Sequence, residues 1–202
     1  MPSPLGHSLA GYAAARLTRI RITRDERLLF AFAALVAVLP DLIGQTLTYL
    51  VDTSPHGFAH SLAALLLVAA LAAALGTRRG FRFWPVFALV AAAYGSHLLA
   101  DLLRPEASPQ DGEQLFWPLP ATFGITLNIF PHIPDRAEHP AFLDYALTLA
   151  AIAAREALIL GPIALLAHLV PPRIPARVDS RTLAPASPGD PLARGSADPG
   201  TR

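Results

Sequence analysis

Two histidines stand four residues apart at the start of a long apolar stretch. His56 and His60 follow Ser54 and Pro55, which suit a helix start because serine caps N-termini and proline is tolerated at the first helical position. Residues four apart share one face of a helix, so both imidazoles are expected to point the same way. Imidazoles are costly beside an apolar helix unless something uses them, and we interpret this pair as metal ligands.

A second pair with the same spacing lies further along the chain. His97 and Asp101 share a helix face near the carboxyl end of another apolar segment. The helix dipole disfavours a carboxylate there by a few tenths to about 1 kcal/mol, and a cation would offset this cost. Asp41 directly follows Pro40, where we expect a helix to end, and His7 opens the first apolar helix.

These polar residues form one predicted set of metal ligands. The set is His7, Asp41, His56, His60, His97 and Asp101. Imidazole and carboxylate ligands suit a divalent ion, with zinc expected first and manganese or iron as alternatives. If all six groups bind, two ions are expected, and two ions about 3.5–4 Å apart suit phosphoester hydrolysis. Asp41 and Asp101 are the candidate catalytic bases.

The composition is that of a membrane protein. Of 202 residues, 53% are hydrophobic and only 15% charged, and mean hydropathy is +0.43. This favours an all-α, polytopic membrane bundle of about four to six helices over a water-soluble bundle with a very apolar core. The chain contains no cysteine, so thiolate ligands and disulfides are excluded. The N-terminus has no positively charged leader region, so no removable signal peptide is expected.

The apolar stretches predict where the helices lie. They cover residues 5–18, 28–39, 57–77, 83–103 and 142–170, with residues 42–51 as a bent continuation of the second. Residues 1–170 are expected to form one membrane domain, and residues 171–202 a disordered tail rich in proline and arginine. The first two helices have about a dozen residues each, fewer than the roughly 20 that span a bilayer.

Folding these segments up and down separates two kinds of residue. The candidate ligands gather at one end of the bundle, and the arginine clusters gather at the other. Positive charge beside short membrane segments marks the cytoplasmic side. We therefore expect a multi-pass inner-membrane protein with cytoplasmic arginine-rich turns and tail, and with its metal site toward the outer face.

Several short motifs carry a resemblance to a known family. They are Gly6-His7-Ser8-Leu9, Leu39-Pro40-Asp41, the segment from His56 to Leu62, the segment from Ser96 to Asp101, and Phe116-Trp117-Pro118-Leu119. Over roughly residues 5–120 the chain resembles the YdjM-like family of membrane-bound, presumed metal-dependent hydrolases. The resemblance implies that the six ligand candidates are the polar residues that matter. Two positions depart from the family pattern: Gly57 replaces an arginine, and Leu42-Ile43-Gly44 replaces a stretch that carries a second aspartate.

The predicted function is metal-dependent hydrolysis at the membrane. The expected partners are membrane lipids and a small-molecule or lipid-linked phosphoester substrate. The order of the ligands is also similar to that in all-helical zinc phospholipase C and nuclease folds. The alternative is a non-enzymatic membrane protein, either a metal carrier or an interaction partner, although a carrier would need polar residues along its spans.

Other interpretations fit the residues less well. A serine protease based on Ser61 or Ser96 is disfavoured because each serine is the direct sequence neighbour of a histidine, which then points away from it on a helix. Nucleic-acid binding is not expected, since the arginine clusters are short. His132 and His139 are predicted to lie on the surface, and His168 at the membrane interface.

Overall fold

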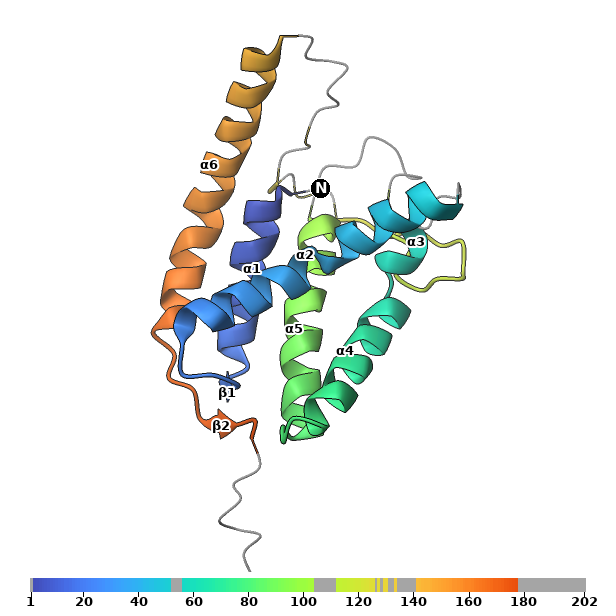
Figure 1. The fold of residues 1–202 in the computed structure, drawn as a ribbon. Coiled ribbons are helices and arrows are strands. Elements are labelled where there is room, and N and C mark those ends of the chain that lie inside the picture. Colours follow the sequence, from blue (N-terminus) through green and yellow to red (C-terminus); the bar gives the residue numbers. More distant parts are fainter. Residues whose placement is uncertain are drawn as a thin grey trace, which may run out of the picture.

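The computed structural model describes residues 2–51, 56–103, 112–125, 127, 129–130, 133 and 141–177. In chain order the elements are α1 (Pro4–Leu17), β1 (Ile20–Arg21), α2 (Glu26–Val51), α3 (His56–Ala59), α4 (Leu62–Thr77), α5 (Phe83–Leu102), α6 (Phe142–His168) and β2 (Ile174–Pro175). This confirms the predicted all-α bundle (Figure 1). His132, His139 and the predicted tail from residue 178 onward lie outside the described residues.

Serine side chains set where two of the helices begin. Ser3 caps α1 by accepting a hydrogen bond from the Gly6 backbone N–H at 3.3 Å, with proline in the first helical turn. Ser61 caps α4 by accepting from the Ala64 N–H at 3.1 Å. This second cap corrects the prediction of one continuous helix over residues 57–77, because Ser61 starts a new helix after α3. His60 therefore lies in the turn between α3 and α4, not on a helix face shared with His56.

Helix α2 continues through Pro40, where the sequence predicted either an end or a bend followed by a continuation over residues 42–51. Proline removes one backbone donor and crowds the preceding turn, which usually stops a helix in water. The apolar flanks of α2 favour the helix on both sides, and neighbouring helices can supply donors to the carbonyls that a proline leaves unbonded. Pro40 therefore loosens a turn inside α2 without ending it.

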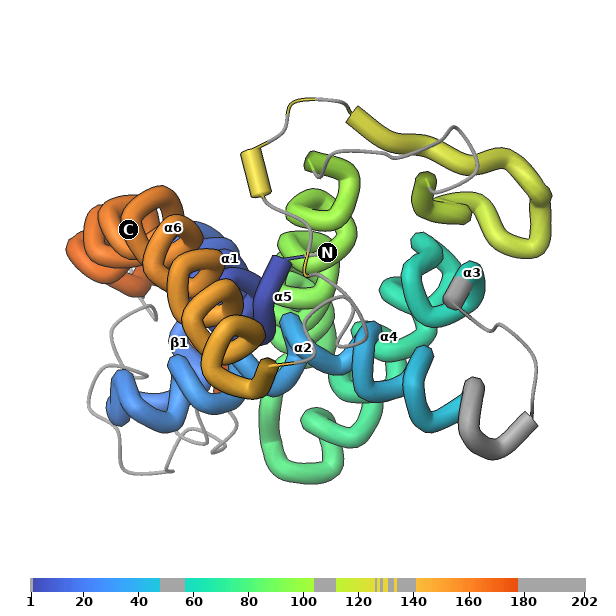
Figure 2. The backbone as a smooth tube through the Cα atoms, turned by 90° about the horizontal axis from the view of Figure 1, so that it is seen from above, coloured from blue at the N-terminus to red at the C-terminus, as the bar shows by residue number. Residues whose placement is uncertain are grey.

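The helices form one bundle with one member lying across the others. Helices α4 and α5 lie side by side, α1 lies between α5 and α6, and α2 crosses α1 and α5 obliquely (Figures 1 and 2). The crossing is close because Gly11 of α1 has no side chain. A Cβ there would overlap the Ala37 side chain and approach the Ala33 carbonyl oxygen to 2.9 Å. This contact places Asp41, one turn beyond Ala37, near the N-terminal half of α1.

The outer surface of the bundle is apolar. Three described helical segments, Glu26–Leu47, Phe83–Leu102 and Phe142–His168, are long and apolar enough to cross a membrane, whereas α4 is shorter. Leucines such as Leu71 (58% exposed) and Leu158 (78% exposed) face outward from α4 and α6. A water-soluble protein does not expose faces of this kind, so the helices are suited to a lipid environment.

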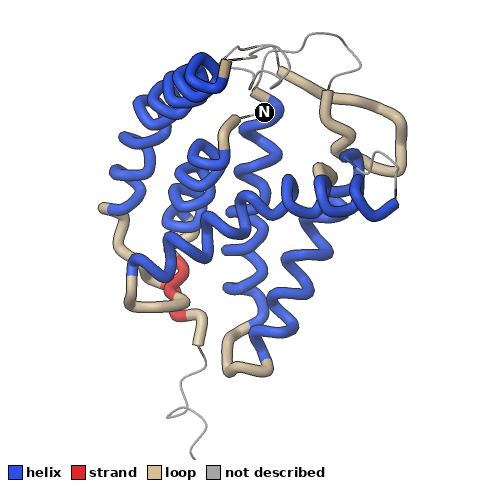
Figure 3. The backbone as a smooth tube through the Cα atoms, turned by 45° about the horizontal axis from the view of Figure 1, so that its top comes forward, coloured by secondary structure: helices blue, strands red, loops and turns tan. Residues whose placement is uncertain are grey.

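A short strand pair connects the segment after α1 with the segment after α6. Strands β1 and β2 are parallel, with Ile20 opposite Ile174 and Arg21 opposite Pro175. The pair lies at the end of the bundle where α1 and α6 finish (Figure 3). Residues 171–177, which composition assigned to the tail, therefore run along the α1–α2 connection.

Candidate metal centre

Five of the six predicted ligands meet inside the bundle, and they come from four parts of the chain. His7 closes the first turn of α1, after the Ser3 cap, and Asp41 follows Pro40 in α2. His60 lies in the turn before α4, and His97 and Asp101 lie one turn apart near the end of α5. His56 begins α3, but its side chain lies outside the part of the structure that is described.

The three imidazoles surround the two carboxylates. His97 Nε2 lies 3.0 Å from Asp101 Oδ2 and 3.7 Å from Asp41 Oδ1. His60 Nε2 lies 3.3 Å from Asp41 Oδ1 and 3.6 Å from Asp101 Oδ2. His7 Nε2 lies 3.7 Å from Asp101 Oδ1 and 4.0 Å from Asp41 Oδ2. Each histidine thus approaches both carboxylates within 4.0 Å.

These separations suit ligands of a single ion. Two ligands that lie 2.0–2.2 Å from a metal at a tetrahedral angle are about 3.3–3.6 Å apart. Two triads satisfy the spacing of a metal site, His7–His97–Asp101 and Asp41–His60–His97, and they share His97. The buried His/Asp cluster can therefore hold a metal ion.

Buried polar atoms without hydrogen-bond partners also support a metal site. The side chains of His7, His60, His97 and Asp101 are at most 1% exposed. Among the described residues, Nδ1 and Nε2 of His7, Nε2 of His97 and both carboxylate oxygens of Asp101 have no hydrogen-bond partner. Leaving such groups unpaired costs roughly 1–3 kcal/mol each, and more for a charge. A cation bound among them would remove this cost, so the donor set fits a divalent ion.

A backbone carbonyl orients His97. Its Nδ1 lies 2.7 Å from the carbonyl oxygen of Ala37, which accepts a hydrogen bond from the ring N–H. The proton is then on Nδ1, and Nε2 is left with a lone pair that faces the carboxylates. Histidine ligands of metals commonly carry such a second partner, which fixes the tautomer and the ring orientation.

A buried glutamate fixes the start of α1, and it is not among the residues predicted from the sequence. Glu156 of α6 is fully buried and accepts hydrogen bonds from the Ser3 backbone N–H at 2.7 Å and from the Ser3 hydroxyl. The position of Gly6 makes room for it, because a Cβ there would lie 2.8 Å from the carboxylate. Glu156 thereby ties α6 to the turn that carries His7. Its only signal in the sequence is an acidic residue within a long apolar segment.

The surroundings shift the pKa values of His7 and His60 in opposite directions. Both residues lie outside the three candidate membrane-spanning segments. Burial, with the stacked His97 ring 3.8 Å away, lowers the pKa of His7 to about 4. Burial also disfavours the charged form of His60, but the hydrogen bond to Asp41 and the charges of Glu113 and Asp101 outweigh it and raise the pKa of His60. His7 is therefore neutral at physiological pH, as a metal ligand must be.

A scan against protein families matches residues 1–170 to the YdjM inner membrane protein family. The chain belongs to this family. No curated protein and no solved structure gave a match. Membership in the YdjM family, together with three apolar helices long enough to span a bilayer, supports a membrane location.

The structure accounts for both positions at which this YdjM protein departs from the expected pattern. The Gln114 side chain fills the space beside Gly57, so that a longer residue at this position would require Gln114 to move. Leu42 is exposed on α2, whereas its sequence neighbour Asp41 is buried in the cluster. Neither position carries a ligand in this chain, and the five clustered residues lie elsewhere.

Three other polar residues considered from the sequence have partners outside the cluster. Ser61 Oγ donates to the Phe58 carbonyl at 2.6 Å, and Ser96 Oγ donates to the Ala93 carbonyl at 2.7 Å, so both hydroxyls bond to their own backbone. His168 lies at the opposite end of the bundle, where its Nδ1 is 2.6 Å from the Tyr12 hydroxyl. These contacts give no support to a serine nucleophile.

Proposed function

We propose that this protein is a membrane-embedded, metal-dependent hydrolase that binds one divalent ion. The ligands would be His7, Asp41, His60, His97 and Asp101, with zinc the most suitable ion for a mixed imidazole and carboxylate set. The observation that carries the proposal is the approach of each of the three imidazoles to both carboxylates within 4.0 Å. One ion is proposed in place of the two first expected, because the two ligand triads share His97.

The five residues would have different roles. A bound ion supplies a Lewis acid that lowers the pKa of water toward neutrality and polarises a phosphoryl or acyl oxygen. Asp101, whose side chain is 1% exposed, is suited to holding the ion. Asp41 has a side chain that is 12% exposed, so it is the carboxylate that substrate and water can reach. With one oxygen on the ion, its other oxygen is the better candidate for the general base.

The location of the cluster suggests the class of substrate. The cluster lies toward the end of α5, away from the arginine-rich turns, which favours an outer-facing site under the positive-inside rule. The segment that follows α5 exposes apolar side chains, including Phe116, Trp117 and Leu119. Aromatic residues of this kind prefer the membrane interface. We therefore propose a phosphoester or lipid-linked substrate that reaches the site from the membrane surface.

Metal content is the first test. The full-length protein, purified in detergent, would be analysed by elemental mass spectrometry beside a His60→Ala, His97→Ala double variant and a His168→Ala control. We expect about one equivalent of a transition metal in the wild type and in the control, and none in the double variant. Hydrolysis of phosphodiester and lipid-phosphate substrates would then be compared in the same three proteins.

Two results would contradict the proposal. One is a wild-type protein that binds no metal even after reconstitution with zinc and with manganese. The other is full hydrolytic activity in a correctly folded double variant that contains no metal. The first result would leave the histidines as polar contacts within the bundle, and the second would separate hydrolysis from the metal.

The burial of the cluster favours a second candidate, a closed metal site that stabilises a non-enzymatic membrane protein. Structural zinc sites are enclosed by protein ligands, whereas catalytic sites keep one position open. Four of the five clustered side chains are at most 1% exposed. In this case a chelator would lower the melting temperature of the protein, and no phosphoester or acyl substrate would be turned over in its metal-loaded form.

A further inference from the structure

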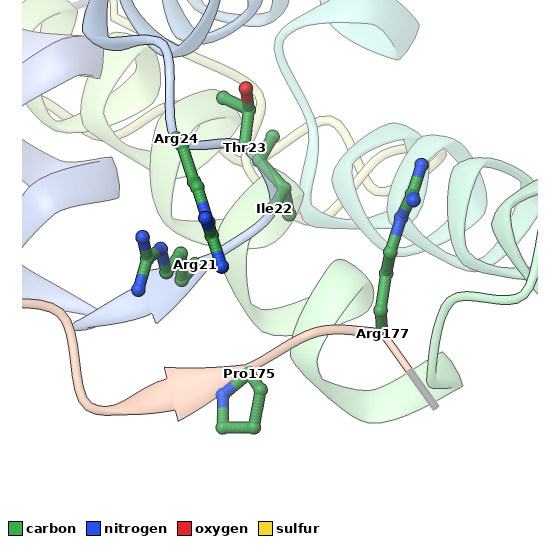
Figure 4. Close-up of a pocket in the computed structure, with 6 residues that line it drawn as sticks. All are labelled: Arg21, Ile22, Thr23, Arg24, Pro175 and Arg177. Carbon is green, nitrogen blue, oxygen red and sulfur yellow. The ribbon is translucent and has the colours of Figure 1, made fainter. Parts of the chain in front are cut away.

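A basic pocket lies at the end of the bundle opposite the metal centre. It has a volume of about 570 Å³ and opens beside the paired strands β1 and β2. Its lining comes from the α1–α2 connection and from the segment after α6: Arg21, Ile22, Thr23, Arg24, Pro175 and Arg177. Figure 4 shows Arg21 and Arg24 on one side of the β1–α2 connection and Arg177 on the other. The strand pair thus brings together arginines that are distant in sequence.

Among the described residues, no acidic side chain lines this pocket. All three arginines are exposed, and the lining contains no carboxylate. The nearest acidic residues in sequence have other partners: Glu26 pairs with Arg16 at 2.9 Å, and Asp25 accepts from the Arg27 backbone N–H. Within the described residues, no ion pair involves an arginine of the pocket. Guanidinium groups arranged around a cavity match the oxygens of a phosphate group.

An apolar pocket adjoins the basic one. It has a volume of about 320 Å³ and lies among α2, α4 and α5, with Phe32 and Gly76 in its lining. The two pockets share Ile22 and Thr23. Arg177 also connects them, because its guanidinium lies 5.0 Å above the ring of Phe81, which lines the apolar pocket. A pocket lined by three arginines thus lies beside an apolar pocket at the end of a membrane bundle.

Arginines at the ends of membrane helices commonly reflect topology alone. That explanation requires neither three arginines in the lining of one cavity nor an apolar pocket beside it. Free phosphate would use the first pocket but not the second. A molecule with a phosphate group at one end and a hydrocarbon chain at the other uses both, and anionic lipids are the abundant source of such molecules at a membrane surface.

We propose that these two pockets together form a binding site for one anionic phospholipid. Its phosphate would lie among Arg21, Arg24 and Arg177, and part of one acyl chain would lie in the apolar pocket. The site is separate from the metal centre, since Leu89 of the apolar pocket precedes His97 by about 12 Å along α5. The proposal therefore does not depend on the hydrolase function.

Native mass spectrometry of the full-length protein in detergent tests this site. The protein would be titrated with phosphatidylglycerol, with phosphatidylcholine and with inorganic phosphate. The test variant replaces the three pocket arginines by glutamine: Arg21→Gln, Arg24→Gln and Arg177→Gln. The matched control removes the same charge from exposed arginines at the same end of the bundle: Arg78→Gln, Arg79→Gln and Arg173→Gln.

We expect the wild type and the control to retain phosphatidylglycerol in preference to phosphatidylcholine. The pocket variant should bind phosphatidylglycerol at least about tenfold more weakly, because it loses charge-assisted hydrogen bonds to the phosphate. An Ala72→Phe variant, which fills the apolar pocket and keeps every arginine, should also bind the lipid more weakly. If the wild type holds metal, an unchanged metal content in each variant would show that the bundle is folded. If the wild type holds no metal, an unchanged melting temperature would show the same.

Three outcomes would overturn the lipid site. Equal losses in the pocket variant and the control would mean that the arginines act only through general charge. Binding of inorganic phosphate as tight as that of phosphatidylglycerol would mean that the apolar pocket contributes nothing. Unchanged lipid binding in Ala72→Phe would likewise mean that no acyl chain occupies the apolar pocket. A protein without metal that still shows the expected lipid pattern would contradict the hydrolase proposal alone.

Discussion

The ring of His97 on α5 donates a hydrogen bond to the carbonyl oxygen of Ala37 on α2 at 2.7 Å. This contact joins two helices and decides which imidazole nitrogen faces Asp41 and Asp101. Pro40 lacks the N–H that would bond to the carbonyl of Val36, so the turn that contains Ala37 has one helical hydrogen bond fewer. The acceptor of a candidate ligand on α5 thus lies in the turn of α2 that the proline weakens.

Replacing Pro40 by alanine should weaken metal binding without weakening the fold. The alanine N–H can bond to the Val36 carbonyl, which tightens the turn and draws the Ala37 carbonyl away from His97. Loss of a partner that orients a ligand typically reduces metal affinity 10–100-fold, so we expect a loss of about tenfold or more. The melting temperature should not fall, because alanine favours a helix. Competition with a chromogenic chelator measures the affinity.

Pro162→Ala is the matched control, since Pro162 also lies inside a helix but is exposed on α6. Its zinc affinity should equal that of the wild type. If Pro40→Ala binds zinc as tightly as Pro162→Ala, the loosened turn has no part in orienting His97.

Metal binding should be lost as the pH falls through the raised pKa of His60. A metal binds the neutral imidazole, so protons compete with it below that pKa. His7, whose pKa is lowered to about 4, stays neutral over this range and does not contribute. Glu113 helps to raise the pKa of His60, so Glu113→Gln should lower that pKa and shift the midpoint of metal release to lower pH. Zinc retained after equilibration over a series of pH values on both sides of this pKa measures the midpoint.

A shift of the midpoint to higher pH in Glu113→Gln would contradict this assignment. It would mean that the glutamate contributes to metal binding directly and not through the charge on His60. A Gln114→Ala variant, which changes the neighbouring side chain without changing the charge, provides the control.

Most of the candidate centre was accessible to sequence reasoning because a membrane protein rarely carries ionisable residues in apolar segments. His97 and Asp101 could be paired from their spacing on one helix. Asp41 and His7 could be added once the apolar segments were arranged up and down. The all-α membrane bundle itself follows from composition and from the length of the apolar segments, and it is confirmed.

The predictions from sequence were wrong where contacts between distant segments override local sequence rules. The proline rule predicted a helix end at Pro40, but apolar flanks and neighbouring helices keep α2 continuous. Helical spacing placed His56 and His60 on one face, but α3 ends at Ala59 and Ser61 caps α4, so His60 lies in the turn between the two helices. The contact between Ser3 and Glu156 spans 153 positions, and no local pattern could have indicated it.

Removing the Glu156 carboxylate should destabilise the start of α1 and weaken metal binding at His7. Glu156→Ala leaves the buried Ser3 N–H without its acceptor, which typically costs about 1–3 kcal/mol. Glu156→Gln keeps a carbonyl oxygen for that N–H and should recover much of the stability. Thermal unfolding in detergent and zinc affinity would be measured for both variants. Equal losses in the two variants would mean that the negative charge, and not the hydrogen bond, holds α1 in place.

Two glycine substitutions test the same contact without removing any polar group. A Cβ at Gly6 would lie 2.8 Å from the Glu156 carboxylate, whereas a Cβ at Gly161 of α6 would meet nothing within 4 Å among the described residues. Gly6→Ala should therefore push Glu156 away from Ser3, lowering both the melting temperature and the zinc affinity. Gly161→Ala should be neutral or slightly stabilising, because alanine favours a helix by up to about 1 kcal/mol over glycine. A Gly6→Ala protein as stable as Gly161→Ala, with unchanged zinc affinity, would show that the Ser3–Glu156 contact does not set the position of His7.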